Sequence, residues 1–244
     1  MLMEQYHAEL YKCLPKRDRI EVIMKENYFT NDSLERQALE LYCQTAEFSH
    51  KKANSFQPRQ SALLICDLQA YFLDPASHAY VPSSGAILDG IIQLIQLYST
   101  YHLPIFFTQH VNSKENAGMM SVWWKDLITA QNQFQRIIPE IDLTRGTLIQ
   151  KSQYDAFHET GLKELLRDKG VTQVIICGVM THLCCESTAR SAFMNGFEVF
   201  FPVDGTATYN LAFHRASLTN LAHGFATIVL MKELSAAIRG EHEA

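Results

Sequence analysis

The chain has 244 residues, of which 47% are hydrophobic and 19% are charged, and its formal net charge is −5. This length fits one large α/β domain, or one domain with an appendage, and the composition is that of a globular protein with a hydrophobic core. The negative charge excludes the basic surface of a typical nucleic-acid-binding protein, and no apolar stretch approaches the roughly 18 residues of a membrane helix. We therefore expect a cytoplasmic protein without a nucleic-acid or membrane partner.

The first 57 residues differ in pattern from the rest of the chain. Three amphipathic helices are predicted there: Met3–Lys12, Lys16–Glu26 and Ser33–Phe48. The apolar stripe of the third is formed by Leu34, Ala38, Leu41, Cys43 and Phe48. We divide the chain into a helical N-terminal extension, residues 1–57, and a main domain, residues 58–244. Short helices need a surface to dock on, so the extension either caps its own domain or packs at a subunit interface near the mouth of the site.

From Ser61 onwards, short apolar runs alternate with longer helical patterns. The predicted strands are Ala62–Cys66, Pro104–Thr108, Thr147–Gln150, Gln173–Gly178, Phe197–Pro202 and Ala226–Leu230. The predicted helices are Ile87–Tyr101, Glu159–Lys169, His182–Met194 and Leu211–His223. Several strands are apolar without alternation, which indicates that both of their faces are covered. The pattern predicts an α/β fold with a parallel sheet, in which ligand sites lie at the carboxyl ends of the strands.

Two charged residues stand at predicted strand ends. Asp67 follows the first strand, and Lys151 follows the third. A carboxylate is costly to bury unless it is paired or used, so Asp67 is a helix cap, half of a structural ion pair, or a functional group. A lysine at a strand end is more often solvated than catalytic, so its position alone does not assign a role to Lys151.

The segment after the fourth strand gives the most specific indication of a reactive residue. Gly178 closes the strand, and a helix is predicted to begin near Cys184 and Cys185. The positive end of a helix dipole favours the thiolate form of a cysteine. Successive helical residues point about 100° apart, so at most one of the two cysteines is expected to face a pocket. The alternative is that both are small buried hydrophobes. For His182, two residues earlier, we expect a structural role rather than that of a base.

Three segments, Phe56–Leu73, Lys151–Phe157 and Val174–Arg190, occur in an order and spacing that resemble the isochorismatase-like cysteine hydrolase family. The resemblance covers about Phe56 to Leu230 and does not cover residues 1–50. It implies a three-layer α/β/α fold with a six-stranded parallel sheet. It further implies an Asp–Lys–Cys catalytic triad, and the matching positions in this chain are Asp67, Lys151 and Cys184.

The resemblance also implies a backbone feature ahead of the nucleophile. Members of the family often have a cis peptide bond at the position of Val179–Met180. Such a bond would aim the backbone N–H groups of Met180 and Cys184 at a developing oxyanion. Members are usually oligomers, so a homo-oligomer, dimer or tetramer, is expected.

Two comparisons within the resemblance distinguish branches of the family. Isochorismatases that cleave a vinyl ether commonly have glycine at the position of Cys184, so a cysteine resembles the branch that cleaves amides and ureides. Nicotinamidases carry an Asp-x-His metal motif after the second strand, where this chain has His110 and Asn112. We therefore predict no catalytic metal and no other cofactor.

The resulting prediction is a metal-independent cysteine hydrolase that cleaves a small amide or ureido substrate through a thioester. The predicted pocket walls are Phe72, His110, Trp123, Trp124 and Tyr154. One alternative is isochorismatase-type cleavage of isochorismate to 2,3-dihydro-2,3-dihydroxybenzoate and pyruvate, with Asp67 as the acid and Cys184 as a bystander. A second alternative is a non-enzymatic binding protein on the same fold.

Overall fold

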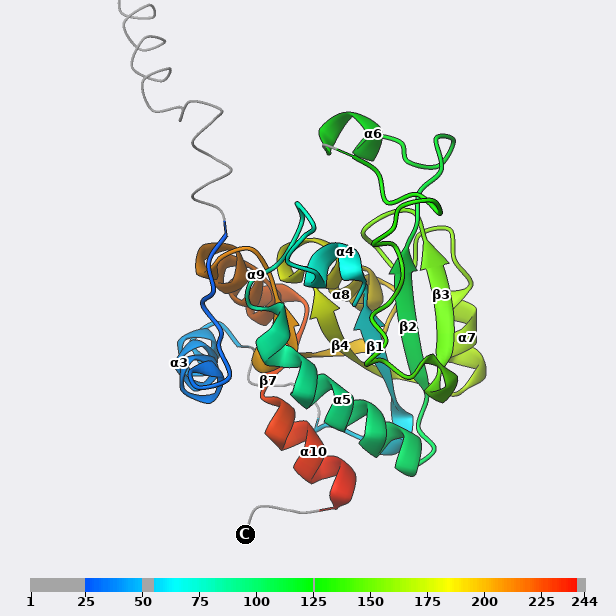
Figure 1. Cartoon of the computed structure of the whole chain (residues 1–244). Coiled ribbons are helices and arrows are strands. Elements are labelled where there is room, and N and C mark those ends of the chain that lie inside the picture. The colour runs from blue at the N-terminus through cyan, green and yellow to red at the C-terminus, as the bar shows by residue number, and fades with distance from the viewer. Residues whose placement is uncertain (1–24, 50–54, 125, 241–244) are drawn as a thin grey trace, which may run out of the picture.

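The computed structural model describes residues 25–49, 55–124 and 126–240, which form a sheet between two layers of helices (Figure 1). The strands are β1 (Ser61–Cys66), β2 (Ile105–His110), β3 (Thr147–Lys151), β4 (Gln173–Val179), β5 (Glu198–Pro202), β6 (Thr206–Ala207) and β7 (Thr227–Val229). The helices are α3 (Leu34–Ala46), α4 (Ala70–Leu73), α5 (Ser84–Thr100), α6 (Met120–Trp123), α7 (Leu162–Asp168), α8 (Glu186–Met194), α9 (Leu211–Gly224) and α10 (Met231–Arg239). The predicted helix Met3–Lys12 and nearly all of Lys16–Glu26 lie outside the described residues.

The sheet has the strand order β3-β2-β1-β4-β5-β7, with β6 beside β4, and every pair is parallel. The predicted six-stranded parallel sheet is confirmed, and the short strand β6 is an addition. All six residues of β1 are buried, as expected for an apolar run that is covered on both faces. The order reverses between β1 and β4, and sheets of this topology bind ligands beside that reversal.

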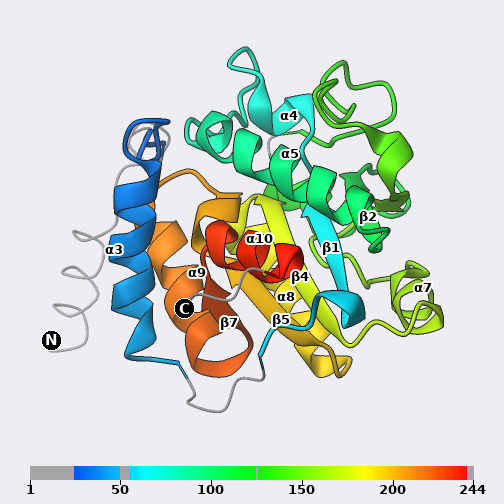
Figure 2. The ribbon, with the colours of Figure 1, turned by 90° about the horizontal axis from the view of Figure 1, so that it is seen from below.

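Helices cover both faces of the sheet, so the predicted three-layer arrangement is also confirmed. Helices α5 and α10 lie together on one face, and α7, α8 and α9 lie on the other (Figure 2). Helix α5 turns a heptad-like set of side chains toward the sheet: Ile87, Ile91, Leu94, Ile95 and Tyr98. Within the described ranges, none of the helices combines the length and the apolar character that a bilayer-spanning segment needs.

Helix α3 of the N-terminal extension packs against α9 and β7 of its own chain. It begins close to the predicted Ser33 and buries Ala38 and Leu41, whereas the side chain of Phe48 is 43% exposed. The predicted stripe was therefore wrong at two positions: Cys43 is exposed, and the helix ends at Ala46 before the stripe reaches Phe48. The described part of the extension caps its own domain.

Residues 25–29 continue this cap toward the carboxyl edge of the sheet. The Thr208 backbone N–H donates to the Tyr28 hydroxyl at 2.9 Å, and the Phe29 N–H donates to the Ser83 hydroxyl at 3.0 Å. The Glu26 N–H donates to the Tyr209 carbonyl at 2.6 Å. This segment therefore ties the loop before α5 to the loop before α9.

Replacing Leu41 with alanine is expected to lower the free energy of unfolding by about 2–4 kcal/mol, because it removes a buried aliphatic side chain and leaves a cavity. Leu41 is 3% exposed. The matched control is Leu39→Ala on the same helix, where the side chain is 46% exposed, and its effect should stay within about 0.5 kcal/mol. Urea unfolding of both variants checks the prediction. Equal losses would mean that α3 does not dock as described.

Candidate active site

The three residues of the predicted triad meet at the carboxyl edge of the sheet. Asp67 directly follows β1, Lys151 is the last residue of β3, and Cys184 lies in the π-helical turn Thr181–Cys185 after β4. The carboxyl ends of parallel strands share one edge of the sheet, which brings residues distant in sequence together. The predicted gathering is confirmed, and the catalytic roles of the three residues remain predictions.

Lys151 lies between the other two members of the triad. Its Nζ atom is 2.7 Å from Asp67 Oδ2, and both side chains are fully buried. The same Nζ is 3.4 Å from Cys184 Sγ and donates to the Gln153 carbonyl at 3.0 Å. His110 Nδ1 lies 3.5 Å from the same Nζ, so four polar atoms surround the ammonium. The contacts fix the position of the charge beside the sulfur.

The ionisation of the triad follows from burial and from these contacts. Burial alone would raise the pKa of the Asp67 carboxyl, but the Lys151 ammonium holds that pKa below its ordinary value. Burial alone would lower the pKa of Lys151, but the Asp67 carboxylate raises it. For Cys184, burial and then the nearby Asp67 raise the thiol pKa well above its ordinary value, and Lys151 opposes them. The resting site therefore holds a carboxylate, an ammonium and a neutral thiol.

This ionisation corrects one expectation from the sequence. The helix dipole was expected to favour a thiolate at Cys184. However, α8 begins only at Glu186, after the π-helical turn, and the Cys184 side chain is buried next to a carboxylate. The cost of burying a second negative charge outweighs the helix end.

The Asp67 carboxylate is aimed by its backbone and by β2. Asp67 has a positive φ of 50°, a conformation that is uncommon outside glycine. The Thr108 hydroxyl donates to Asp67 Oδ1 at 2.6 Å and accepts the Asp67 backbone N–H at 3.2 Å. Oδ1 is thus held by Thr108, and Oδ2 faces Lys151.

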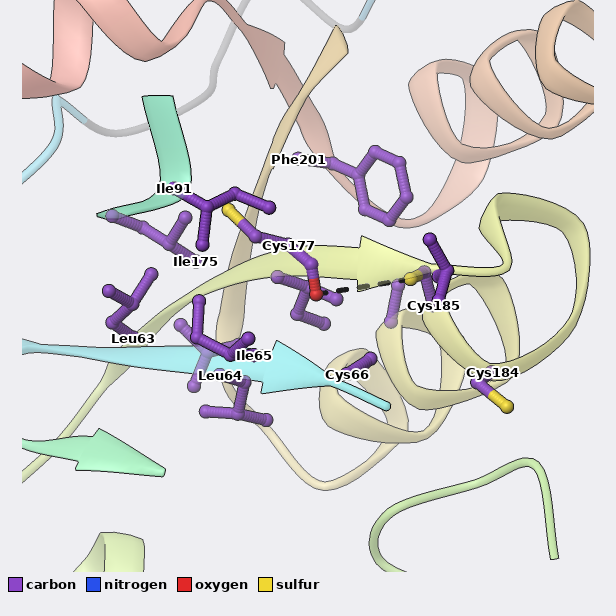
Figure 3. Packing of buried hydrophobic residues seen from close by; sticks show 14 of the residues in the cluster. Leu63, Leu64, Ile65, Cys66, Ile91, Ile175, Cys177, Cys184, Cys185 and Phe201 are labelled. Atoms are coloured by element: carbon purple, nitrogen blue, oxygen red, sulfur yellow. Dashed lines mark hydrogen bonds between the residues drawn. The ribbon is translucent and has the colours of Figure 1, made fainter. Parts of the chain in front are cut away.

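Cys184 and Cys185 point in different directions, as the helical geometry predicts. Figure 3 shows the Cys185 sulfur directed at β4, where it lies 4.0 Å from the Cys177 carbonyl oxygen, and the Cys184 sulfur directed away from that strand. Of the two, only Cys184 lines the cavity described below. Cys185 is a buried core residue.

The turn between β4 and Cys184 depends on Gly178. This residue has a φ of +111°, and a Cβ atom placed on it would lie 2.1 Å from the Cys66 carbonyl oxygen. Only glycine allows β4 to approach β1 so closely here. The cis peptide bond that the resemblance implies is present at Val179–Met180. Met180 lines the cavity beside Cys184, where the two backbone N–H groups are predicted to bind an oxyanion.

A cavity of about 960 Å³ opens onto Cys184. All five predicted wall residues line it: Phe72, His110, Trp123, Trp124 and Tyr154. The Trp124 indole N–H donates to the Tyr154 hydroxyl at 2.6 Å, which joins the loop after α6 to the loop after β3. Trp123 is 76% exposed, so it borders the cavity from the rim.

Sequence reasoning missed other residues that line or support the site. The additional polar and aromatic ones are Lys25, Tyr71, His78, Asn112, Asp126 and Tyr209 in the cavity wall, and Thr108 behind Asp67. Thr108 had a readable signal, because it is a hydroxyl residue near the end of a buried strand that neighbours β1. The others come from loops and, for Tyr71, from the short helix α4, whose contacts depend on the tertiary fold.

A comparison with known protein families matches residues 61–233 to the isochorismatase domain. The chain belongs to the isochorismatase family. Family members of this kind are hydrolases, which agrees with an ion pair and a thiol on the wall of a cavity. The matched range contains the whole triad and leaves out α3 and the segment at residues 25–29.

Curated relatives in the isochorismatase family have different names. Nicotinamidase 3 of Arabidopsis thaliana is 39% identical over 185 residues, which cover 74% of this chain and 89% of that protein. Enterobactin synthase component B of Escherichia coli (strain K12) is 29% identical over 186 residues, which cover 74% of this chain and 64% of that protein. Isochorismatase of Bacillus subtilis (strain 168) is 30% identical over 183 residues, and this chain spans 57% of its length.

Solved structures share the fold of this isochorismatase-family chain. A cysteine hydrolase from Pseudomonas syringae pv. phaseolicola 1448A superposes with a TM-score of 0.74 at 23% identity, over 78% of this chain and 97% of that one. A pyrazinamidase of Pyrococcus horikoshii in complex with zinc gives a TM-score of 0.64 at 23% identity, over 70% and 99%. At these identities the similarity establishes the fold.

His110 and Asn112 stand where nicotinamidases carry the Asp and His of their metal motif. In this chain the two side chains are hydrogen-bonded to each other. The Asn112 amide donates to the Ser152 carbonyl at 2.8 Å, so its oxygen faces His110 Nε2, also at 2.8 Å. His110 Nε2 is therefore the donor, and Nδ1 faces Lys151 Nζ at 3.5 Å. Burial, together with Lys151, lowers the pKa of His110 to about 4, so the ring is neutral.

A second set of potential ligands also fails to fit a metal ion. The donor atoms of Asp67, His110 and Cys184 lie within 4.8 Å of one another. The Lys151 ammonium lies 2.7 Å from the first, 3.5 Å from the second and 3.4 Å from the third. A cation among these atoms would meet a positive charge in contact with every ligand. The donor set therefore fits the lysine and not a metal.

Chelation is expected to leave any hydrolytic activity of the chain unchanged, because neither donor set offers a free place for a cation. The measurement compares initial rates before and after dialysis against EDTA. A loss of rate that zinc or manganese restores would contradict the prediction.

His182 has the structural surroundings that were expected of it. Its Nδ1 is hydrogen-bonded to the Thr208 hydroxyl, and its ring stacks on Phe213 with centroids 4.5 Å apart. Burial lowers its pKa to about 4. His182 holds the loop before α9 and is not among the described residues that line the cavity.

Proposed function

We propose that this chain is a cysteine hydrolase that cleaves the C–N bond of a small amide or ureido compound through a thioester intermediate. The observation that carries the proposal is the position of Cys184. Its sulfur lies on the cavity wall, 3.4 Å from an ammonium that is itself paired with Asp67 at 2.7 Å. A thiol beside a buried carboxylate is the arrangement that nucleophilic catalysis requires.

In the first step, Asp67 accepts the proton of the Cys184 thiol while the sulfur attacks the substrate carbonyl carbon. Lys151 holds the pKa of Asp67 below its ordinary value, so Asp67 is ionised at rest and a proton acceptor stands beside the thiol. The Lys151 ammonium stabilises the negative charge as it passes to the sulfur and to the carbonyl oxygen. The neutral resting thiol means that the thiolate forms only as the attack proceeds.

In the next steps, the backbone N–H groups of Met180 and Cys184 stabilise the oxyanion of the tetrahedral intermediate. Asp67 returns its proton to the leaving nitrogen as the C–N bond breaks, which releases ammonia or an amine and leaves the thioester. A water molecule then gives a proton to Asp67 and attacks the thioester carbon. The C–S bond breaks, the sulfur recovers the proton, and the carboxylic or carbamic acid leaves.

The ionisation of Asp67 favours this route over the ether-cleaving alternative. Hydrolysis of a vinyl ether requires an acid that protonates the enol carbon. Lys151 lowers the pKa of Asp67, so the resting carboxylate carries no proton to donate. The similarity to a relative named isochorismatase is the observation that supports the ether-cleaving alternative. The thiol next to the ammonium has no task in ether cleavage.

The experiment is a substrate panel assayed by release of ammonia, with release of pyruvate from isochorismate measured in parallel. Nicotinamide belongs in the panel because of the relative named nicotinamidase, together with aliphatic amides and ureido compounds. Ammonia release that iodoacetamide treatment of Cys184 abolishes would support the proposal. Pyruvate release at an undiminished rate after that treatment would replace it with the alternative.

A further inference from the structure

Three polar side chains outside the triad form a cluster on the wall of the same cavity. The Tyr71 hydroxyl donates to Asp126 Oδ1, and His78 Nε2 lies 3.2 Å from the same oxygen. The Tyr71 hydroxyl and His78 Nε2 are 3.4 Å apart. Tyr71 belongs to α4, His78 to the loop before α5, and Asp126 to the loop after α6. The proposed hydrolysis uses none of the three.

The contacts leave part of the Asp126 carboxylate available to a ligand. Among the described residues, both of its partners use Oδ1, so Oδ2 carries no contact with them. The side chains of His78 and Asp126 are 40% and 47% exposed. Asp126 is also the only carboxylate among the described residues that line the cavity. A ligand in the cavity therefore has one negatively charged group to bind.

The remaining wall suits a cation with an apolar body. Aromatic side chains line it: Tyr71, Phe72, Trp123, Trp124, Tyr154 and Tyr209. One ammonium already lies on this wall, because Lys25 Nζ is 5.0 Å from the centroid of the Tyr209 ring and donates to the His78 carbonyl. Cations bind favourably over aromatic faces. The charge of Lys25 opposes a second cation nearby, so such a cation needs direct contact with Asp126.

We propose that Asp126, positioned by Tyr71 and His78, binds a basic nitrogen of the substrate at the end remote from the scissile bond. The substrate class is then a small amide or ureido compound that also carries an ammonium or guanidinium group. That the ligand is a substrate rests on the proposed hydrolysis, whereas binding of the cation by Asp126 does not depend on turnover. Asp126 is a specificity-determining residue in this account.

Two ligands of the same shape test the proposal: 3-(aminomethyl)benzamide, which is a cation at pH 7, and neutral 3-(hydroxymethyl)benzamide. Their Kd values are measured by calorimetry in the Cys184→Ala chain, so that neither is consumed. The same measurement is made with Asp126→Asn added, which keeps an oxygen acceptor for Tyr71, and with the control Asp142→Asn added. Asp142 is an exposed carboxylate outside the cavity.

The expected result is that the cation binds about tenfold more tightly than the alcohol, as a charge-assisted hydrogen bond provides. Asp126→Asn should remove that preference, and Asp142→Asn should keep it. Equal binding of the two ligands, or a preference that survives Asp126→Asn, would overturn the proposal. An equal loss of both ligands in Asp126→Asn would overturn it too, because the cluster would then only fasten the loop after α6. If the preference is found but the unmodified chain releases no ammonia from these two amides or from any member of the amide and ureido panel, the proposed hydrolysis fails and the binding site stands.

Discussion

Replacing Cys184 with alanine is expected to lower kcat for amide or ureide hydrolysis by at least about 1,000-fold, because the variant lacks the sulfur that forms the thioester. The side chain points into the cavity and lies beside Lys151. Removing a single sulfur atom from the cavity wall leaves the sheet and its helices in place. The measurement is the steady-state rate of ammonia release on the best substrate of the panel, with circular dichroism to verify the fold.

Cys185→Ala is the matched control for this experiment. Cys185 neighbours Cys184 in sequence, is fully buried, and directs its sulfur at β4 (Figure 3). Its replacement is expected to leave kcat within about threefold of the unmodified chain and to cost about 1 kcal/mol of stability. Equal losses of activity in the two variants would contradict the assignment of Cys184. Full activity in Cys184→Ala, with pyruvate release from isochorismate, would favour the ether-cleaving alternative.

The sheet could be predicted from the sequence because its signal is local. The run Ala62–Cys66 is apolar at every position and is followed by the charged Asp67. An apolar run without alternation indicates a strand covered on both faces. The six predicted strands all appear, with ends shifted by one or two residues. Strand β6 and helices α4 and α6 span only two to four residues each, too few to show a periodicity.

The triad was located by the resemblance to the family, because strand-end positions alone left a structural role open for Asp67, Lys151 and Cys184. A parallel topology places strand ends at one edge of the sheet, which is where the three residues lie. The ionisation of Cys184 could not be predicted, because it depends on how deeply the thiol is buried and on the distance to Asp67. The Asp126 cluster could not be predicted either. Tyr71 lies in a short helix, and His78 and Asp126 lie in two separate loops, with no sequence spacing that indicates their contact.

Replacing Lys151 with methionine is expected to shift the alkylation profile of Cys184 to higher pH by roughly one unit or more, because the ammonium favours the thiolate. The sign follows from the contacts: the thiol pKa is already raised by burial and Asp67, and Lys151 is the group that lowers it. The alkylation rate rises as pH increases through the thiol pKa, so the variant should react more slowly at every pH below its own pKa. Mass spectrometry of the Cys184 peptide after iodoacetamide treatment between pH 6 and about 11 measures the profile.

A second variant separates electrostatics from damage to the fold. Lys151→Met alone leaves the Asp67 carboxylate buried without its cation, at a cost of about 3–5 kcal/mol in stability. Adding Asp67→Asn removes that charge. Because the Asp67 carboxylate raises the thiol pKa, the double variant should alkylate at lower pH than Lys151→Met. It should still lack hydrolytic activity, since no group remains to accept the thiol proton. An alkylation profile that is the same in the unmodified chain and both variants would mean that neither charge acts on the sulfur, and the proposed roles of Asp67 and Lys151 would then fail together.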